Sequence, residues 1–505
     1  AGGGDDFAGH SQRGARGYGP TGNSGGQRPE AEPPLSATLA LLIAYSTLLV
    51  GLGLALGRMV RSSHAFFVAG RKLGAGLIFA TILAANIGAG STVGAAGLGY
   101  RNGLAGWWWV GSAGIGTLLL AWWLGPRIWR VARAHDLNTV GDYLELRYGA
   151  SVRLIIALLL WLGTLAILAG QLIAVAWILE VVAGVPKLWG CLIGGVVMTV
   201  YFTAGGLFTS AWVNLVELVV LLSGLGLALP WVLIHGGWQR LTSGTPGLAA
   251  GALSFWQQGS SGWPYLVLLV PAFLVSPGLI QKVYGARDER AVRLGVGLAG
   301  VALLVFAALP PLLGMLAHAY VPNLSNPELA LPTILIRGLP PSLGALGLAA
   351  VFSAELSSAD AILFMLATSL SEDLYRRFLR PEASDRKVLA VARWAALAGG
   401  LLGVVLSLAL PSVIGSLSIF YSLLGVSLFV PVIAGLHSKK PGVLEALAAI
   451  VGGVVLLIAT RLWPGGSLWG GQLATTVALA GSALAFVAVY AWKRSTSGPS
   501  GSSEV

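Results

Sequence analysis

Apolar runs of about twenty residues recur along this chain from residue 35 to residue 492. A helix of that length crosses the hydrocarbon core of a bilayer. Only 10% of the residues are charged and 56% are hydrophobic, whereas soluble proteins carry about 25% charged residues. We therefore predict an all-α polytopic membrane protein, because a membrane β-barrel would show short alternating segments instead.

The apolar runs predict about thirteen transmembrane helices. They lie at 35–57, 75–98, 105–125, 151–183, 186–203, 208–236, 263–281, 294–319, 343–370, 388–409, 412–436, 441–461 and 470–492. Arginine and lysine gather in alternate loops, as in the loop of Arg127, Arg130 and Arg133. By the positive-inside rule, the N-terminus lies outside and the C-terminus in the cytoplasm. The net charge of +11 is thus a topology signal, and we expect no nucleic-acid partner.

The order of the spans predicts an internal repeat. One leading helix would precede two five-helix units of opposite topology, and two helices would follow them. The predicted segments are a disordered extracellular tail at 1–34, the leading helix at 35–57, the first inverted repeat at 75–236, the second at 263–436, trailing helices at 441–492 and a cytoplasmic tail at 493–505. The single cysteine, Cys191, excludes an internal disulfide.

Each predicted repeat opens with an interrupted span. The first contains the glycine-rich stretch from Ala84 to Gly99, and the second contains Pro271 to Gly278. Irregular backbone at membrane depth is tolerated only where it is buried in protein or lines a polar cavity. Interrupted helices at matching positions of inverted repeats point to a binding site near the membrane midplane. Glycine and proline are also common in membrane helices in general, so the alternative interpretation is that these residues have no binding role.

Two serines fall near the middle of span 343–370. Ala354, Ser357 and Ser358 share one helical face there. Two hydroxyls, together with carbonyls from a broken helix, would form an uncharged all-oxygen shell. That shell suits a monovalent cation, because divalent ions prefer carboxylates and transition metals prefer His or Cys. Serines in membrane helices also commonly bond to their own helix or to a neighbour.

Several motifs in order resemble the sodium:solute symporter family. They are Phe66-Phe67-Val68-Ala69-Gly70-Arg71, Ala84-Ala85-Asn86-Ile87, Pro126-Arg127 with Asp142-Tyr143-Leu144, Gly205-Gly206 with Trp212, Ser276-Pro277 with Gln281-Lys282, and Ser357-Ser358 with Glu372-Asp373-Leu374-Tyr375. The resemblance covers about residues 40–460. It implies the leucine-transporter architecture of two inverted five-helix repeats. It also implies a sodium site formed by the carbonyls of Ala84, Ile87 and Ala354 and the hydroxyls of Ser357 and Ser358.

The chain departs from the family pattern at three polar positions on the expected ion path. The family commonly has Trp-Thr-Asp where this chain has Trp212-Val213-Asn214, so a second sodium is in doubt. Glu217, one turn further on, is either a substitute for that aspartate or a helix-interface hydrogen bonder. Glu355 is either a proton-binding group or extra cation ligand, or a protonated side chain bonded to a neighbouring helix.

The expected substrate pocket is small and mostly apolar. Its residues are Asn86, Gly90 and Ser91 from the first broken span and Leu269, Ala272 and Phe273 from the second. A sugar would need more polar partners than Asn86 and Ser91 offer, so an amino acid or monocarboxylate is favoured. Trp107, Trp108 and Trp109 are expected to be anchors at the membrane interface, with a role in the pocket wall as the less favoured alternative.

The sequence thus predicts a sodium-coupled symporter that imports a small organic solute by alternating access. We expect it in the plasma (inner) membrane, surrounded by the lipid bilayer, with Na⁺ as coupling ion and no cofactor. Two alternatives stay open: proton coupling through Glu355 or Glu217, and a solute sensor, which the short C-terminal segment disfavours. No triad, phosphate loop or metal cluster is visible, so we do not expect an enzyme.

Overall fold

The computed structural model describes residues 35–57, 69–203, 207–242, 251–256, 262–462 and 470–496. These residues form helices and connecting segments and contain no β-sheet; a single bridge joins Leu73 and Ala286. The predicted tail at 1–34, the end of the C-terminal tail from 497, and the motif residues 66–68 and 205–206 lie outside the described residues.

The helices follow the apolar runs closely. They are α1 (Leu35–Gly57), α3 (Ala75–Asn86), α4 (Ala95–Asn102), α5 (Trp107–Leu119), α6 (Gly125–Ala134), α7 (Val140–Tyr148), α8 (Ala150–Ala183), α9 (Lys187–Thr203), α10 (Leu207–Val232), α11 (Trp238–Thr242), α12 (Trp263–Leu274), α13 (Pro277–Tyr284), α14 (Glu289–Phe306), α15 (Leu309–Tyr320), α16 (Ala330–Arg337), α17 (Pro341–Thr368), α18 (Asp385–Ala409), α19 (Val413–His437), α20 (Val443–Leu462) and α21 (Gly470–Thr496). The π-helical segment η2 (Gly90–Gly94) leads directly into α4. Another π-helical segment, η8 (Ser369–Leu379), directly follows α17.

Local sequence explains where several helices begin and end. The 34-residue α8 ends at Gly184, whose φ of 64° is left-handed and favours glycine. Thr139 caps α7 by accepting a hydrogen bond from the amide of Asp142, whose carboxylate in turn accepts from the amide of Thr139. Pro277 starts α13, where its missing N–H costs nothing.

The structure confirms an all-helical membrane protein but not the number thirteen. Ten helical stretches among the described residues are long and apolar enough to cross a membrane. Three shorter apolar helices, Leu39–Leu48, Ala75–Asn86 and Lys187–Val200, lie within the other predicted spans. The second predicted span is short because its helix stops at Asn86 and resumes only after a break.

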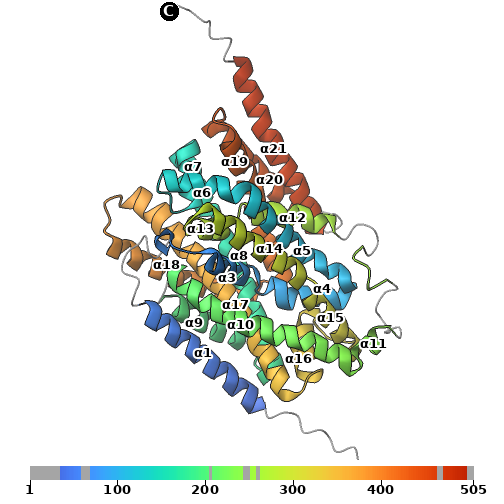
Figure 1. Ribbon diagram of the computed structural model, residues 1–505. Coiled ribbons are helices and arrows are strands. Elements are labelled where there is room, and N and C mark those ends of the chain that lie inside the picture. Colours follow the sequence, from blue (N-terminus) through green and yellow to red (C-terminus); the bar gives the residue numbers. More distant parts are fainter. Residues whose placement is uncertain are drawn as a thin grey trace, which may run out of the picture.

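The broken helix α3 and the long helix α17 lie at the centre of the bundle (Figure 1). The side chains of α17 from Gly344 to Thr368 are mostly buried, and α10, α8 and α18 pack against this helix. Helices α20 and α21 pair at one edge, and α1 lies at the other. The start of α1 and the end of α21 lie at opposite ends of the molecule (Figure 1). Of the candidate spans among the described residues, the one that contains α17 is the most completely enclosed by protein.

Candidate ion and solute site

The first helix break lies where the glycine-rich stretch predicts it. Helix α3 ends at Asn86, and Ile87 takes an extended conformation with φ −103° and ψ 100°. The last carbonyls of a helix have no partner within it, so this end presents acceptors to the interior. One of them, the carbonyl oxygen of Asn86, accepts a hydrogen bond from the Ser91 hydroxyl at 2.6 Å.

The two central serines of α17 face this break. The Ser358 hydroxyl lies 3.0 Å from the Ile87 carbonyl oxygen and 3.3 Å from that of Ala84. The Ser357 hydroxyl lies 3.2 Å from the Ala84 carbonyl oxygen and 3.0 Å from that of Ala354. All five groups assigned to a sodium site from the sequence therefore meet in one place, and both serine side chains are buried.

Glycine is required for this approach. A Cβ atom on Gly88 would lie 2.2 Å from the Ser358 hydroxyl oxygen, closer than two such atoms can come. The Gln171 side chain of α8 fills the remaining space, and its oxygen accepts a hydrogen bond from the Ala89 amide at 2.9 Å. Gln171 thus satisfies backbone that the break leaves unpaired, a role that sequence reasoning missed.

The three polar residues on the expected ion path are buried but do not join the five-group cluster. Asn214 donates a hydrogen bond to the Thr81 hydroxyl at 3.3 Å, which links α10 to α3. The backbone carbonyl of Glu217 accepts from Ser353. One carboxyl oxygen of Glu355 lies 2.7 Å from the Thr92 hydroxyl, and the other has no hydrogen-bond partner among the described residues. Glu355 therefore contacts the half-helix beyond the break.

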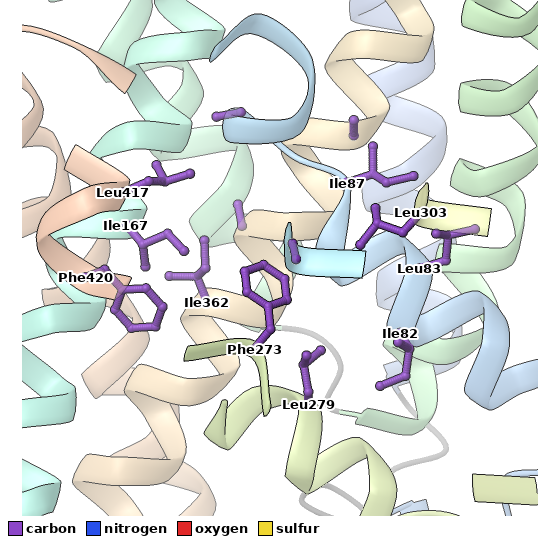
Figure 2. Close-up of a cluster of buried hydrophobic side chains, with 14 of the residues drawn as sticks. Ile82, Leu83, Ile87, Ile167, Phe273, Leu279, Leu303, Ile362, Leu417 and Phe420 are labelled. Atoms are coloured by element: carbon purple, nitrogen blue, oxygen red, sulfur yellow. The ribbon is translucent and has the colours of Figure 1, made fainter. Parts of the chain in front are cut away.

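The second break separates α12 from α13 at Val275 and Ser276. A central cavity lies between the two breaks. Asn86, Gly90, Ser91, Leu269 and Phe273 line it, as the sequence predicts. Figure 2 shows Phe273 and Leu279 beside Ile362 of α17 and Ile167 of α8, so helices distant in sequence form one apolar wall.

Three features of the predicted pocket need correction. Ala272 is fully buried but is not on the cavity wall; its backbone lies near Gly425 of α19 instead. Trp109 is buried and lines the cavity, so it is not an interfacial anchor. The wall also carries polar groups absent from the prediction, namely Gln171, Ser276, Lys282 and Tyr421.

A second, smaller cavity lies next to the central one. Residues of α7, α8, α13 and the α17–η8 segment line it, including Gly141, Gln281 and Asp373. Among the described residues, Met365 is the one that lines both cavities. Helix α7 thus forms part of the wall of this second cavity.

An ionic cluster holds α7 against α8 and η8. The guanidinium of Arg153 forms ion pairs at 2.8 Å with Asp142, Glu145 and Asp373. The Thr139 hydroxyl donates to Asp373 at 2.7 Å. Glu145 lies outside the candidate spans. Burial opposes ionisation of Glu145, but hydrogen bonds from Arg377 and Arg153 outweigh it and lower its pKa below 4.5.

A central helix broken beside two serines, a second broken helix and a cavity between them define a membrane transporter of the leucine-transporter type. A family model described as "Sodium:solute symporter family" matches residues 66–453. The chain belongs to the sodium:solute symporter family.

Named relatives and a solved structure agree with this assignment. The sodium/pantothenate symporter of Escherichia coli K12 is 29% identical over 83% of this chain and 90% of its own. The sodium/glucose cotransporter of Vibrio parahaemolyticus is 24% identical over 70% of this chain and 71% of its own. The outward-open structure of a Na⁺-coupled sialic acid symporter has a TM-score of 0.75 at 16% identity, covering 90% of this chain and 97% of that one.

The family assignment supports sodium-coupled symport by an integral membrane protein. The solute does not follow from it, because the names of the relatives include pantothenate, glucose, choline and iodide. The inverted-repeat architecture expected from the sequence is confirmed at the level of the fold, while the repeat boundaries at 75–236 and 263–436 stay predictions.

Proposed function

We propose that the carbonyls of Ala84, Ile87 and Ala354 and the hydroxyls of Ser357 and Ser358 bind the sodium ion that drives transport. The observation that carries this proposal is the meeting of these groups at the first break, with oxygen–oxygen distances of 3.0–3.3 Å. Five neutral oxygens offer no charge to a divalent ion. They match the hardness and single charge of sodium, and the ion would join α3 to α17.

The solute occupies the central cavity beside the ion. Asn86, Gly90, Ser91 and Phe273 lie on its wall, so ion and solute share the same broken helix. An amino acid or a monocarboxylate fits this wall better than a sugar, because much of it is apolar. The solute crosses the membrane unchanged, so the protein is a transporter and no enzyme.

In the proposed cycle, sodium stabilises the outward-open state, solute binds next, and inward opening releases both past Asn214 and α7. The N-terminal segment would lie outside and the C-terminal segment in the cytoplasm of a plasma-membrane protein. The membrane potential contributes to the driving force, since one elementary charge crossing 100 mV releases about 2.3 kcal/mol.

The test is sodium binding to the purified protein, followed by uptake into proteoliposomes. Sodium, but not potassium, should raise the melting temperature, and the double variant Ser357→Ala with Ser358→Ala should lose that shift. Ser427→Ala is the matched control, because the Ser427 hydroxyl bonds to its own helix at Leu423. The control should behave as wild type.

Two results would contradict the proposal. One is a sodium-induced shift that survives in the double serine variant. The other is uptake that follows a pH gradient and ignores sodium, which would favour proton coupling through Glu355 or Glu217.

A further inference from the structure

Lys282 is a buried cation on the wall of the central cavity. It lies on α13, the half-helix that follows the second break, and its exposed fraction is 1%. Gly278 and Leu279, about one turn earlier on the same face, also line the cavity. The opposite face of α13, with Pro277 and Gln281, lines the second cavity instead. The Lys282 side chain is therefore directed to the solute space.

Among the described residues, none forms a hydrogen bond or an ion pair with the Lys282 ammonium. Asp360 of α17 interacts with it electrostatically from further away. Taking an ammonium out of water costs several kcal/mol unless a counter-charge and hydrogen bonds replace the lost water. A negatively charged group in the cavity would supply both.

The rest of the inner wall is also electropositive. Helix α13 begins beside the cavity at Ser276 and Pro277. The first amides of a helix have no partner within it and carry a partial positive charge. No aspartate or glutamate is among the described residues on the wall. An anion is therefore favoured at this end, while a solute ammonium would find no carboxylate partner.

Aromatic side chains form another part of the cavity wall. Trp109, Phe273, Phe420 and Tyr421 line it, and the rings of Phe273 and Tyr421 lie 5.2 Å apart. Aromatic walls favour an apolar body over one rich in hydroxyls. The cavity wall thus combines a buried cation with several aromatic rings.

From this combination we propose that Lys282 binds the carboxylate of a monocarboxylate solute whose apolar body contacts the aromatic side chains and which carries no ammonium group. This inference rests on the proposed function and selects one solute class from it. The Lys282 ammonium donates hydrogen bonds to the carboxylate, and the first amides of α13 stabilise its charge.

The experiment compares two matched solute trios by thermal shift of the full-length protein in sodium and in potassium. The first trio is propionate, propionamide and L-alanine. The second is 3-phenylpropionate, 3-phenylpropionamide and L-phenylalanine, and D-glucose is added as a neutral polyol. We expect sodium-dependent stabilisation by a carboxylate of at least one trio, and none by its amide, its amino acid or glucose.

Variants assign the effect to Lys282. Lys282→Met and Lys282→Gln should each weaken carboxylate binding roughly 10- to 100-fold, because they remove a charge-assisted hydrogen bond. Lys282→Arg keeps the positive charge and should therefore retain part of the carboxylate binding. Lys387→Met, at an exposed lysine on α18, should bind as wild type. Size-exclusion profiles show whether each variant is folded. Two neutral replacements are used so that the test still works if one of them does not fold.

The outcomes separate this inference from the proposed function. Carboxylate binding that is unchanged in both neutral variants, binding of the amide, amino acid or glucose instead, or binding of no carboxylate would each overturn it. The sodium-induced shift measured without solute tests the sodium site alone. If that shift is present and carboxylates fail to bind, only the assignment of Lys282 and its solute class is wrong.

Discussion

At the scale of single residues, the proposed sodium site depends on the absence of one side chain. The Ser358 hydroxyl lies in the space where a side chain on Gly88 would begin. Both the carbonyl of Ile87 and the serine therefore reach the same point only because residue 88 has no Cβ atom. The side-chain oxygen of Gln171 would lie 3.0 Å from the same Cβ atom. Gln171 therefore cannot move away to make room without losing its hydrogen bond from the Ala89 amide.

We expect Gly88→Ala to displace Ser358 and to raise the half-saturating sodium concentration at least about tenfold, a loss of about 1.4 kcal/mol. The measurement is a sodium titration of the melting temperature. Gly76→Ala on α3 is the control, because a Cβ at Gly76 meets nothing within 4 Å. Equal sodium affinity in the two variants would show that the Ser358 contact does not hold the ion.

At the scale of elements, the ionic cluster around Arg153 fastens α7 to the inner ends of α8 and η8. Asp373 has 5% of its side chain exposed, and Arg153 has 7%. Removal of one partner from a buried pair leaves an uncompensated charge, which costs about 3–5 kcal/mol. We expect Arg153→Met to lower the apparent melting temperature by several degrees. The exposed Arg393→Met on α18 should leave it unchanged, and similar effects of both variants would refute a structural role of the cluster.

The same cluster predicts a dependence on pH. The pKa of Glu145 is lowered from 4.5 in the folded protein, so its ionised form is favoured by folding. Its contribution to stability is present above about pH 4.5 and is lost as the pH falls through the lowered pKa. The difference in melting temperature between wild type and Glu145→Gln should therefore shrink below about pH 4.5. A difference that is constant through this range would contradict the assignment.

The sequence predicts the elements and the breaks well, because apolar length and runs of glycine and proline are local signals. It also places Ser357 and Ser358 on one helical face. It does not reveal Gln171 or Lys282, because their roles depend on contacts between distant helices. Gln171 reaches Ala89 across 82 residues of sequence. Ala272 is an example of a residue that the sequence wrongly placed on the cavity wall. It directly precedes Phe273 and yet does not line the cavity.

At the scale of the whole molecule, the two ends of the described chain lie at opposite ends of the bundle (Figure 1). This arrangement agrees with an odd number of crossings, and the orientation expected from the basic loops stays a prediction. The orientation can be tested by cysteine labelling, since Cys191 is the single cysteine of the chain and is buried.

We expect a membrane-impermeant thiol reagent, applied to intact cells, to label Asn323→Cys but not Arg380→Cys in a Cys191→Ala background. Both positions are exposed, the first after α15 and the second after η8. Permeabilised cells provide the control, in which both variants should be labelled. The reverse pattern in intact cells would invert the proposed orientation.

The shared position of Met365 has a consequence for how well this protein insulates the membrane. Met365 lines both cavities and lies against Gly278. The partition that separates the two cavities therefore includes a flexible, polarizable thioether. A carrier must never leave a continuous water-filled passage, since ions would then dissipate the gradient without moving solute. A smaller residue at position 365 would thin this partition, and we expect it to raise ion leak before it changes turnover.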